Sequence, residues 1–169
     1  MSAVVVDTNV VLVANGQHRD VSSGCVAACA LKLQAVMRQG RLALDDCFRI
    51  LSEYQKKTTP KTGNRPGDAF VKWALQNNAN QHRVDRIELQ EHAGRVFASF
   101  PDDPDLAQFD RSDRKFVAVA AAHPERPPIL QAADSKWLAW EKPLRRHDIT
   151  VEFLCPDDIE RFQANKSKP

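Results

Sequence analysis

The sequence predicts an α/β protein, a three-layer α/β/α sandwich built on a mostly parallel central sheet. Short apolar runs of strand length, such as residues 3–6 and 129–133, alternate with longer segments whose apolar residues recur at helical spacing. Strands that alternate with helices typically form parallel sheets covered on both faces. The chain has 169 residues, and we expect it to fold as a single domain over 1–169.

The composition argues against several classes of protein. A formal net charge of +2 is too small for a protein that coats polyanions, so any nucleic-acid role requires a local basic patch. No apolar run reaches the roughly 18–20 residues of a membrane span, and the first run lacks the basic residues that precede a signal sequence. We therefore expect a cytoplasmic protein. Its four cysteines lie in apolar patterns and are expected to be buried, reduced thiols: Cys25, Cys29, Cys47 and Cys155.

The first third of the chain predicts two strands, each followed by helical sequence. Residues 3–6 form a strand buried on both faces, and residues 8–16 form a turn or short helix that leaves the sheet. Serine caps, an apolar stripe and a closing glycine predict a helix over about 22–38. Residues 42–44 form a short strand, and the helix after it has an apolar stripe that includes residues 48–54.

The middle of the chain is expected to hold additional helices. Residues 58–67 contain two prolines and two glycines, which predicts an exposed, mobile loop. Helices are predicted over about 68–77 and 84–97, before a proline-rich break at 101–105.

The last third repeats the alternation of strand and helix. A helix over 113–121 is followed by two prolines and a short strand at 129–133. Residues 149–154 form the last strand, and a proline and two aspartates at 156–158 begin the closing helix.

Four acidic residues occupy corresponding places in these elements. Asp7 and Asp134 each end an apolar strand, where the carboxyl edge of a parallel sheet forms a crevice for ligands. Asp113 lies in the first turn of its helix, on the apolar stripe, and Glu53 flanks the stripe of another helix. Taken singly, the aspartates could be turn, cap or helix N-terminal residues, and Glu53 could form a surface pair with Lys57.

Together, the four acids indicate a site for a hard cation. Carboxylates gathered in one crevice repel each other, and a divalent ion relieves that repulsion. Mg²⁺ or Mn²⁺ prefers oxygen ligands and often binds only one or two protein carboxylates directly. Such a site suits hydrolysis of phosphodiester bonds.

The same acids lie in segments that resemble, in order, the acidic motifs of the PIN domain family. The segments are Val-Val-Val-Asp7-Thr-Asn, Leu-Ser-Glu53, Asp113-Arg-Lys-Phe-Val-Ala-Val-Ala and Ile-Leu-Gln-Ala-Ala-Asp134. The final Val-Glu-Phe-Leu-Cys-Pro156 resembles the last strand and helix start of that family. The residues after Asp134 match only approximately. The chain is longer than a compact toxin of the family, so the resemblance implies that 58–105 is a family-variable helical insertion within the single domain.

The resemblance implies a metal-dependent nuclease, in most members a ribonuclease, that uses Mg²⁺ or Mn²⁺ and leaves a 5′-phosphate. It implies that Asp7, Glu53 and Asp113 bind metal and that Asp134 is the more variable fourth acid. Thr8 and Asn9 match polar positions that hold a water or a neighbouring carboxylate. VapC-type members are toxins paired with an antitoxin protein, and homodimers are common, so both are candidate partners besides RNA.

Several basic residues are candidates to bind RNA phosphates, although surface ion pairs are the better explanation for most of them, and the two in the loop at 58–67 are the better candidates. The candidates are Lys56, Lys57, Lys61, Arg65 and Arg114. Trp137 and Trp140 could stack on bases, but a packing role is the better interpretation.

Two other functions compete with a ribonuclease. A phosphatase with Asp7 as nucleophile would need a second acid two residues later, and that position is Asn9. A non-catalytic PIN-like module that binds RNA or protein is the other alternative, although all four acids are present.

Overall fold

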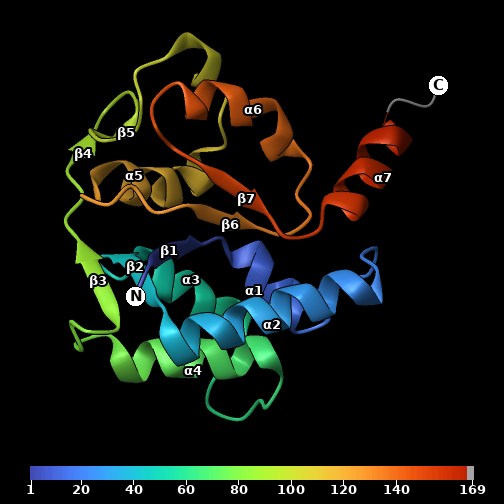
Figure 1. Cartoon of the computed structure of the whole chain (residues 1–169). Coiled ribbons are helices and arrows are strands. Elements are labelled where there is room, and N and C mark those ends of the chain that lie inside the picture. The colour runs from blue at the N-terminus through green and yellow to red at the C-terminus, as the bar shows by residue number, and fades with distance from the viewer. Residues whose placement is uncertain (167–169) are drawn as a thin grey trace.

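The computed structural model describes residues 1–166 and confirms the predicted α/β class and three-layer architecture. Five parallel strands form the central sheet in the order β3-β2-β1-β6-β7 (Figure 1). The strands are β1 (Ala3–Val6), β2 (Arg41–Asp45), β3 (Val84–Ile87), β6 (Ile129–Gln131) and β7 (Val151–Phe153).

Helices cover both faces of this sheet (Figure 1). One face carries α1 (Thr8–Ala14), α2 (Ser23–Gln39), α3 (Arg49–Lys57) and α4 (Pro66–Asn77). The other carries α5 (Arg114–Ala122) and α6 (Lys136–Arg145), while α7 (Pro156–Lys166) follows β7. Two short 3₁₀ turns, η1 (Pro104–Leu106) and η2 (Arg111–Asp113), precede α5.

The central strand β1 is where the order of the sheet reverses. All four of its residues are buried, as the unbroken apolar run requires. It pairs in parallel with β2 on one side and with β6 on the other, with Val5 opposite Ile129. Beyond the carboxyl ends of β1 and β6, the connections leave in opposite directions, which opens a crevice there. Asp7 is the first residue after β1 and lies at this point.

The prediction of a helix over 84–97 is wrong. This segment contains the edge strand β3 and a small antiparallel hairpin of β4 (Glu91–His92) and β5 (Val96–Phe97). Pairing of β3 with all but the first residue of β2 accounts for the strand, because sheet hydrogen bonds outweigh a weak helical pattern. The range 58–105 therefore contains strands β3, β4 and β5 besides the helix α4, and its interpretation as an insertion stays a prediction.

The loop before α4 is tied down by one buried aspartate. Asp68, fully buried, accepts hydrogen bonds from the Thr59 backbone N–H at 3.0 Å and from the Asn15 side chain at 2.9 Å. It also forms an ion pair with Arg65 at 3.2 Å. A Cβ at Gly63 would lie 2.1 Å from the Asp68 carboxylate, so the close turn requires glycine. The expected loose loop is therefore anchored to α1 and α4.

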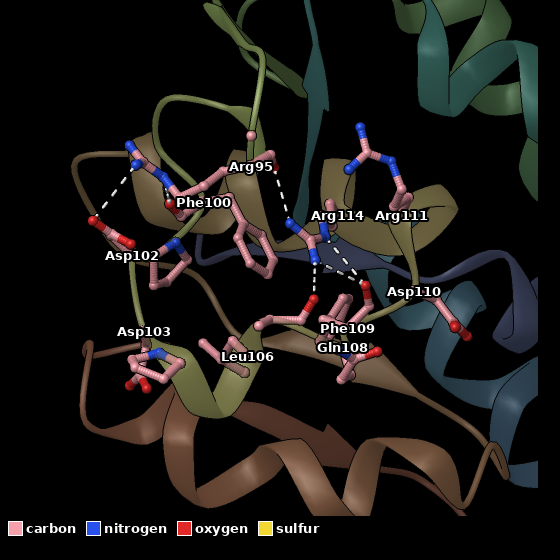
Figure 2. A pocket seen from close by; sticks show the side chains of 14 residues that line it. Arg95, Phe100, Asp102, Asp103, Leu106, Gln108, Phe109, Asp110, Arg111 and Arg114 are labelled. Atoms are coloured by element: carbon pink, nitrogen blue, oxygen red, sulfur yellow. Dashed lines mark hydrogen bonds and ion pairs between the residues drawn. The ribbon is translucent and has the colours of Figure 1, made fainter.

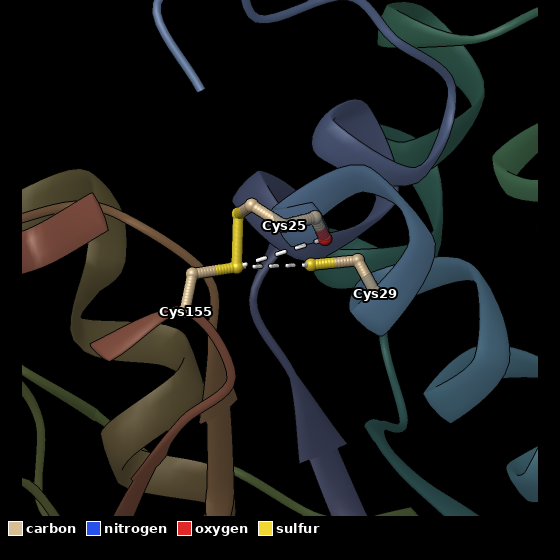
Figure 3. Close-up of side chains that lie close together, drawn as sticks. All are labelled: Cys25, Cys29 and Cys155. Carbon is tan, nitrogen blue, oxygen red and sulfur yellow. Dashed lines mark hydrogen bonds between the residues drawn. A yellow bond between two sulfur atoms is a disulfide. The ribbon is translucent and has the colours of Figure 1, made fainter. Parts of the chain in front are cut away.

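Two of the four cysteines form a disulfide bond, so the expectation of reduced thiols is wrong for them. Cys25, near the start of α2, is bonded to Cys155, which precedes α7 (Figure 3). The third buried cysteine, Cys29, is free, and its Sγ lies 3.9 Å from the Sγ of Cys155. Burial raises the pKa of the Cys29 thiol to about 12. Pairing across 130 positions depends on the docking of α2 against β7, which spacing in the sequence does not reveal.

Loss of this disulfide is expected to lower the free energy of unfolding by about 2–4 kcal/mol, because the bond restricts the unfolded chain over a long loop. Cys25→Ala should therefore unfold at a lower denaturant concentration than the wild type. Cys47→Ala is the matched control, since Cys47 is exposed and free. Because Cys29 could bond to Cys155 in this variant, the Cys25→Ala/Cys155→Ala double variant is measured beside it, and coincident unfolding curves for that double variant and the wild type would show that the bond contributes nothing.

Within residues 1–166, no helix combines the length and the apolar character that crossing a membrane requires.

Candidate active site

Asp7 is a buried carboxylate at the switch point of the sheet. Its side chain, only 5% exposed, caps α1 by accepting a hydrogen bond from the Asn9 backbone N–H at 3.0 Å. The side-chain amide of Gln131, the last residue of β6, donates to its other oxygen. Burial, together with the charges of Asp113 and Asp134, raises the pKa of Asp7 to about 7 against the opposing effect of these two hydrogen bonds. Asp7 therefore lies among other acids.

Asp113 approaches the same crevice from the opposite face of the sheet. It is the half-buried residue at which η2 passes into α5. Burial raises its pKa to about 6, opposed by Lys115 and reinforced by Asp134, Glu53 and Asp110. The Asp113 carboxylate accepts no hydrogen bond from the part of the chain that the structure describes. A half-buried carboxylate without a donor is suited to bind a cation or an ordered water.

Glu53 is held by two neighbours, one from each side of the site. The Thr8 hydroxyl donates to one of its oxygens, and the Lys115 ammonium lies 3.1 Å from the other. Glu53 is on α3, Thr8 begins α1 and Lys115 is in the first turn of α5. These contacts fix Glu53 in the crevice, and Lys115 supplies a positive charge beside the acids.

Asp134 completes the set at the rim of the site. Its carboxylate accepts a hydrogen bond from the Lys136 backbone N–H at 3.1 Å, a contact that also stabilises the start of α6. The side chain of Asn9 accepts a hydrogen bond from the Ala133 backbone N–H at 3.1 Å, which fixes the turn that carries Asp134. This contact and the amide chemistry of Asn9 give no support to a phosphatase, which needs an acid at that position.

The donor set fits Mg²⁺ or Mn²⁺, because it consists of carboxylate oxygens and includes one carboxylate with no hydrogen-bond donor. The acids influence one another electrostatically: Asp113 and Asp134 act on Asp7, and Asp134 and Glu53 act on Asp113. Among residues 1–166, no three of the four bring their oxygens within 4.8 Å of one another. Without bound metal, three of these acids are therefore not gathered as closely as the ligands of one ion, within the part of the chain that the structure describes.

Gln131 and Tyr54 support the site and were not singled out from the sequence. The Gln131 side-chain oxygen accepts from the Ala132 N–H at 3.0 Å, which directs its amide group toward Asp7. The Tyr54 hydroxyl donates to the carbonyl of Val6, the residue that precedes Asp7. A glutamine inside the otherwise apolar run 129–133 was the available signal, since a polar residue buried at a strand end needs a partner.

Arg114 does not belong with the RNA-binding candidates. Its side chain is buried, and it donates to the backbone carbonyls of Arg95, Ala107 and Phe109 at 3.0–3.3 Å (Figure 2). The guanidinium also lies 4.4 Å from the centre of the Phe100 ring. These contacts hold together the loops before α5 and leave Arg114 unavailable to a phosphate. The expectation that Arg114 binds RNA is therefore wrong.

The other predicted basic residues lie on exposed surfaces. Lys56 and Lys57 are in the last turn of α3, and Lys61 is in the loop that follows. Arg65 is paired with Asp68. In the described chain, no ion pair joins any of these four side chains to an acid of the site, and their binding to RNA stays a prediction.

The two tryptophans differ in burial. Trp137 is fully buried, with the Phe109 ring 5.1 Å away in an edge-to-face arrangement, so the packing interpretation applies to it. Trp140 is partly buried and contacts the same ring at 4.3 Å.

A second group of metal-type ligands lies at the amino edge of the sheet, away from the four acids. Asp85, His123 and Glu125 place ligand atoms within 4.8 Å of one another. Arg41, the first residue of β2, already forms ion pairs with Asp85 at 3.0 Å and with Glu125 at 2.5 Å. His123 contacts Asp85 at 2.8 Å. This guanidinium neutralises the acids, which favours a structural network.

Comparison of the chain with models of protein families, with curated proteins and with solved structures finds no match.

Proposed function

We propose that this protein is a metal-dependent endoribonuclease that hydrolyses phosphodiester bonds of single-stranded RNA. One observation supports the proposal: Asp7, Asp113, Asp134 and Glu53 come from four separate elements near the carboxyl end of β1, and the charges of neighbouring acids raise the pKa values of Asp7 and Asp113. A structural role does not explain why an interior carboxylate such as Asp7 lies next to other acids, because the arrangement is costly without a cation. The ordered motifs that resemble PIN domains support the same function.

In this proposal, Asp7 and Asp113 are the direct ligands of Mg²⁺ or Mn²⁺, with Asp134 at the rim. When bound, the ion would activate a water and neutralise charge on the phosphate. The chain itself fixes the ligands. The Gln131 amide and the Asn9 N–H orient Asp7. The contacts of Glu53 with Thr8 and Lys115 position it to bind a water of the ion and not the ion itself. Lys115 also supplies a positive charge for a phosphate oxygen.

A non-catalytic RNA-binding module is the second candidate, and one observation favours it. The Lys115 ammonium already lies 3.1 Å from Glu53, so part of the acidic charge is neutralised without a metal. Such a protein would bind RNA but would not cleave it.

Incubation of single-stranded RNA with the purified chain distinguishes the two candidates. The ribonuclease is expected to cleave in millimolar Mn²⁺ or Mg²⁺, to stop in EDTA, and to leave products with 5′-phosphate ends. Intact RNA under all conditions, with retained binding, would establish the non-catalytic module. Cleavage that persists in EDTA and leaves 2′,3′-cyclic phosphates would contradict the metal-dependent mechanism. The toxin role, an antitoxin partner and a homodimer stay predictions from the resemblance.

A further inference from the structure

The β4–β5 hairpin forms one wall of a pocket that shares a residue with the acidic site. We call it the hairpin pocket; it has a volume of about 660 Å³ and lies between the hairpin, the start of α3 and η2. Its lining includes Arg49, Glu91, His92, Phe97, Arg111 and Lys115. Lys115 contacts Glu53, so this lysine links the lining of the pocket to the site of the four acids.

The charge of the pocket is opposite to that of the acidic site. Three cationic side chains and one carboxylate line it, which gives a net charge of +2 when His92 is neutral. Arg49 is held in place by ion pairs with Asp45 and Glu91, both at 3.4 Å, and by the Phe97 ring at 5.1 Å. A fixed guanidinium beside an acidic site is suited to a phosphate that lies next to the bound metal.

Arg111 is the cation in the pocket that has no protein partner. It is exposed, and no hydrogen bond or ion pair joins its guanidinium to the described part of the chain. Figure 2 shows its side chain directed away from the backbone carbonyls that accept hydrogen bonds from Arg114. Arg111 and Asp113 belong to the same short 3₁₀ turn, η2, and Arg111 shares the lining of the hairpin pocket with Lys115. An unpaired arginine at this position is available for a phosphate.

The hairpin is shaped to complete the pocket. The His92 Nδ1 accepts hydrogen bonds from the backbone N–H groups of Gly94 and Arg95, both at 3.1 Å, so the neutral ring carries its proton on Nε2. Val96, also in the lining, has a φ of 73°, which a β-branched residue rarely adopts. The two backbone N–H contacts fix the ring of the exposed His92 on the wall of the pocket.

We propose that the hairpin pocket binds the backbone phosphate next to the one that is cleaved, with Arg111 and Arg49 as its contacts. This inference rests on the proposed function for the position of the scissile phosphate. It commits to single-stranded RNA, because a flexible strand can place successive phosphates on Arg111 and at the acids. Surface lysines on α3 are not required for this contact.

The test is a binding titration of a short fluorescein-labelled oligouridylate with the full-length chain in EDTA, where metal-dependent cleavage cannot proceed. Arg111→Ala is expected to weaken binding about tenfold, the typical effect of losing a charged hydrogen bond. It should also reduce the slope of log K against log salt concentration by about 0.7, the contribution of one phosphate contact on a single strand. Arg111→Lys, which keeps the charge, should retain most of the slope.

Arg38→Ala is the matched control, because Arg38 is an exposed arginine at the far end of α2. Equal affinities and slopes for wild type and Arg111→Ala would overturn the proposal, as would an equal loss for Arg38→Ala or no binding by the wild type. Arg111-dependent binding without any Mn²⁺-dependent cleavage would contradict the proposed ribonuclease activity but support the proposed phosphate site in the hairpin pocket. Mn²⁺-dependent cleavage by a protein whose RNA affinity does not depend on Arg111 would support the ribonuclease activity and contradict the proposed phosphate site.

Discussion

Asp7→Asn and Asp113→Asn are each expected to reduce Mn²⁺-dependent cleavage of single-stranded RNA by at least about 10²-fold, because loss of an outer partner of a metal site alone costs about 10–100-fold. Asparagine keeps the size of the side chain and one acceptor oxygen, so the fold should persist. It removes the negative charge that a divalent ion needs. The measurement is the initial rate of cleavage under single-turnover conditions, with circular dichroism to verify the fold.

Asp157→Asn is the matched control for these variants. Asp157 is an exposed aspartate at the start of α7, and it has no ion-pair partner in the described chain. Its rate should equal that of the wild type. A folded Asp113→Asn protein that cleaves at the wild-type rate would remove the central residue of the proposed site. An equal loss in Asp157→Asn would point to a general effect of charge.

The second large effect concerns stability without metal. The pKa of Asp7 rises to about 7 in the folded protein from an ordinary value of 3.8, mainly because of burial. The folded state therefore holds a proton that the unfolded state releases. The stability from this group is fully present below about pH 4 and is lost as the pH rises through about 7. In EDTA, the wild type should become less stable over this interval.

Asp7→Asn should lose most of that pH dependence. The raised pKa corresponds to an upper limit of about 4 kcal/mol, at about 1.4 kcal/mol per pKa unit. Asparagine avoids the cost of burying a charge but recovers only part of this free energy, because its NH₂ group faces the donor amide of Gln131. We expect the variant to be about 1–3 kcal/mol more stable than the wild type at pH 8 in EDTA, and to lose this advantage at pH 4.

Urea unfolding at both pH values tests this expectation, and millimolar Mn²⁺ provides an independent measurement. An ion that binds the folded state raises its melting temperature, and the rise should be larger for the wild type than for Asp7→Asn. Parallel pH profiles for the two proteins would mean that Asp7 is not the group that titrates. Equal shifts with Mn²⁺ would place the ion elsewhere.

The arrangement of the sheet could be predicted because its signals are local. Residues 3–6 form an unbroken apolar run, and such a run specifies a strand buried on both faces wherever it packs. The same logic placed Asp7 at the edge of the sheet. The hairpin at 91–97 could not be predicted, because its two-residue strands depend on the contacts of Arg49 with Glu91 and Phe97.

The supporting contacts of the candidate site also depend on tertiary structure. The sequence named the four acids, but it did not reveal that Lys115 would pair with Glu53 across the sheet. Nor did it separate Arg114, which is buried among carbonyls, from its exposed neighbour Arg111. Both arginines flank the same acid and look alike in the sequence. Only the fold of the loops before α5 decides which guanidinium is free.

The thiol of Cys29, 3.9 Å from the bonded sulfur of Cys155, also bears on how the purified protein should be handled. With a pKa of about 12, it is a reactive thiolate in only about one molecule in 10⁵ at neutral pH, so exchange with the adjacent bond is suppressed while the chain is folded. Denaturation returns the thiol to an ordinary pKa of about 8.5, which raises that fraction more than a thousandfold. Unfolded samples should therefore exchange this bond for isomers that include Cys29 unless free thiols are blocked first.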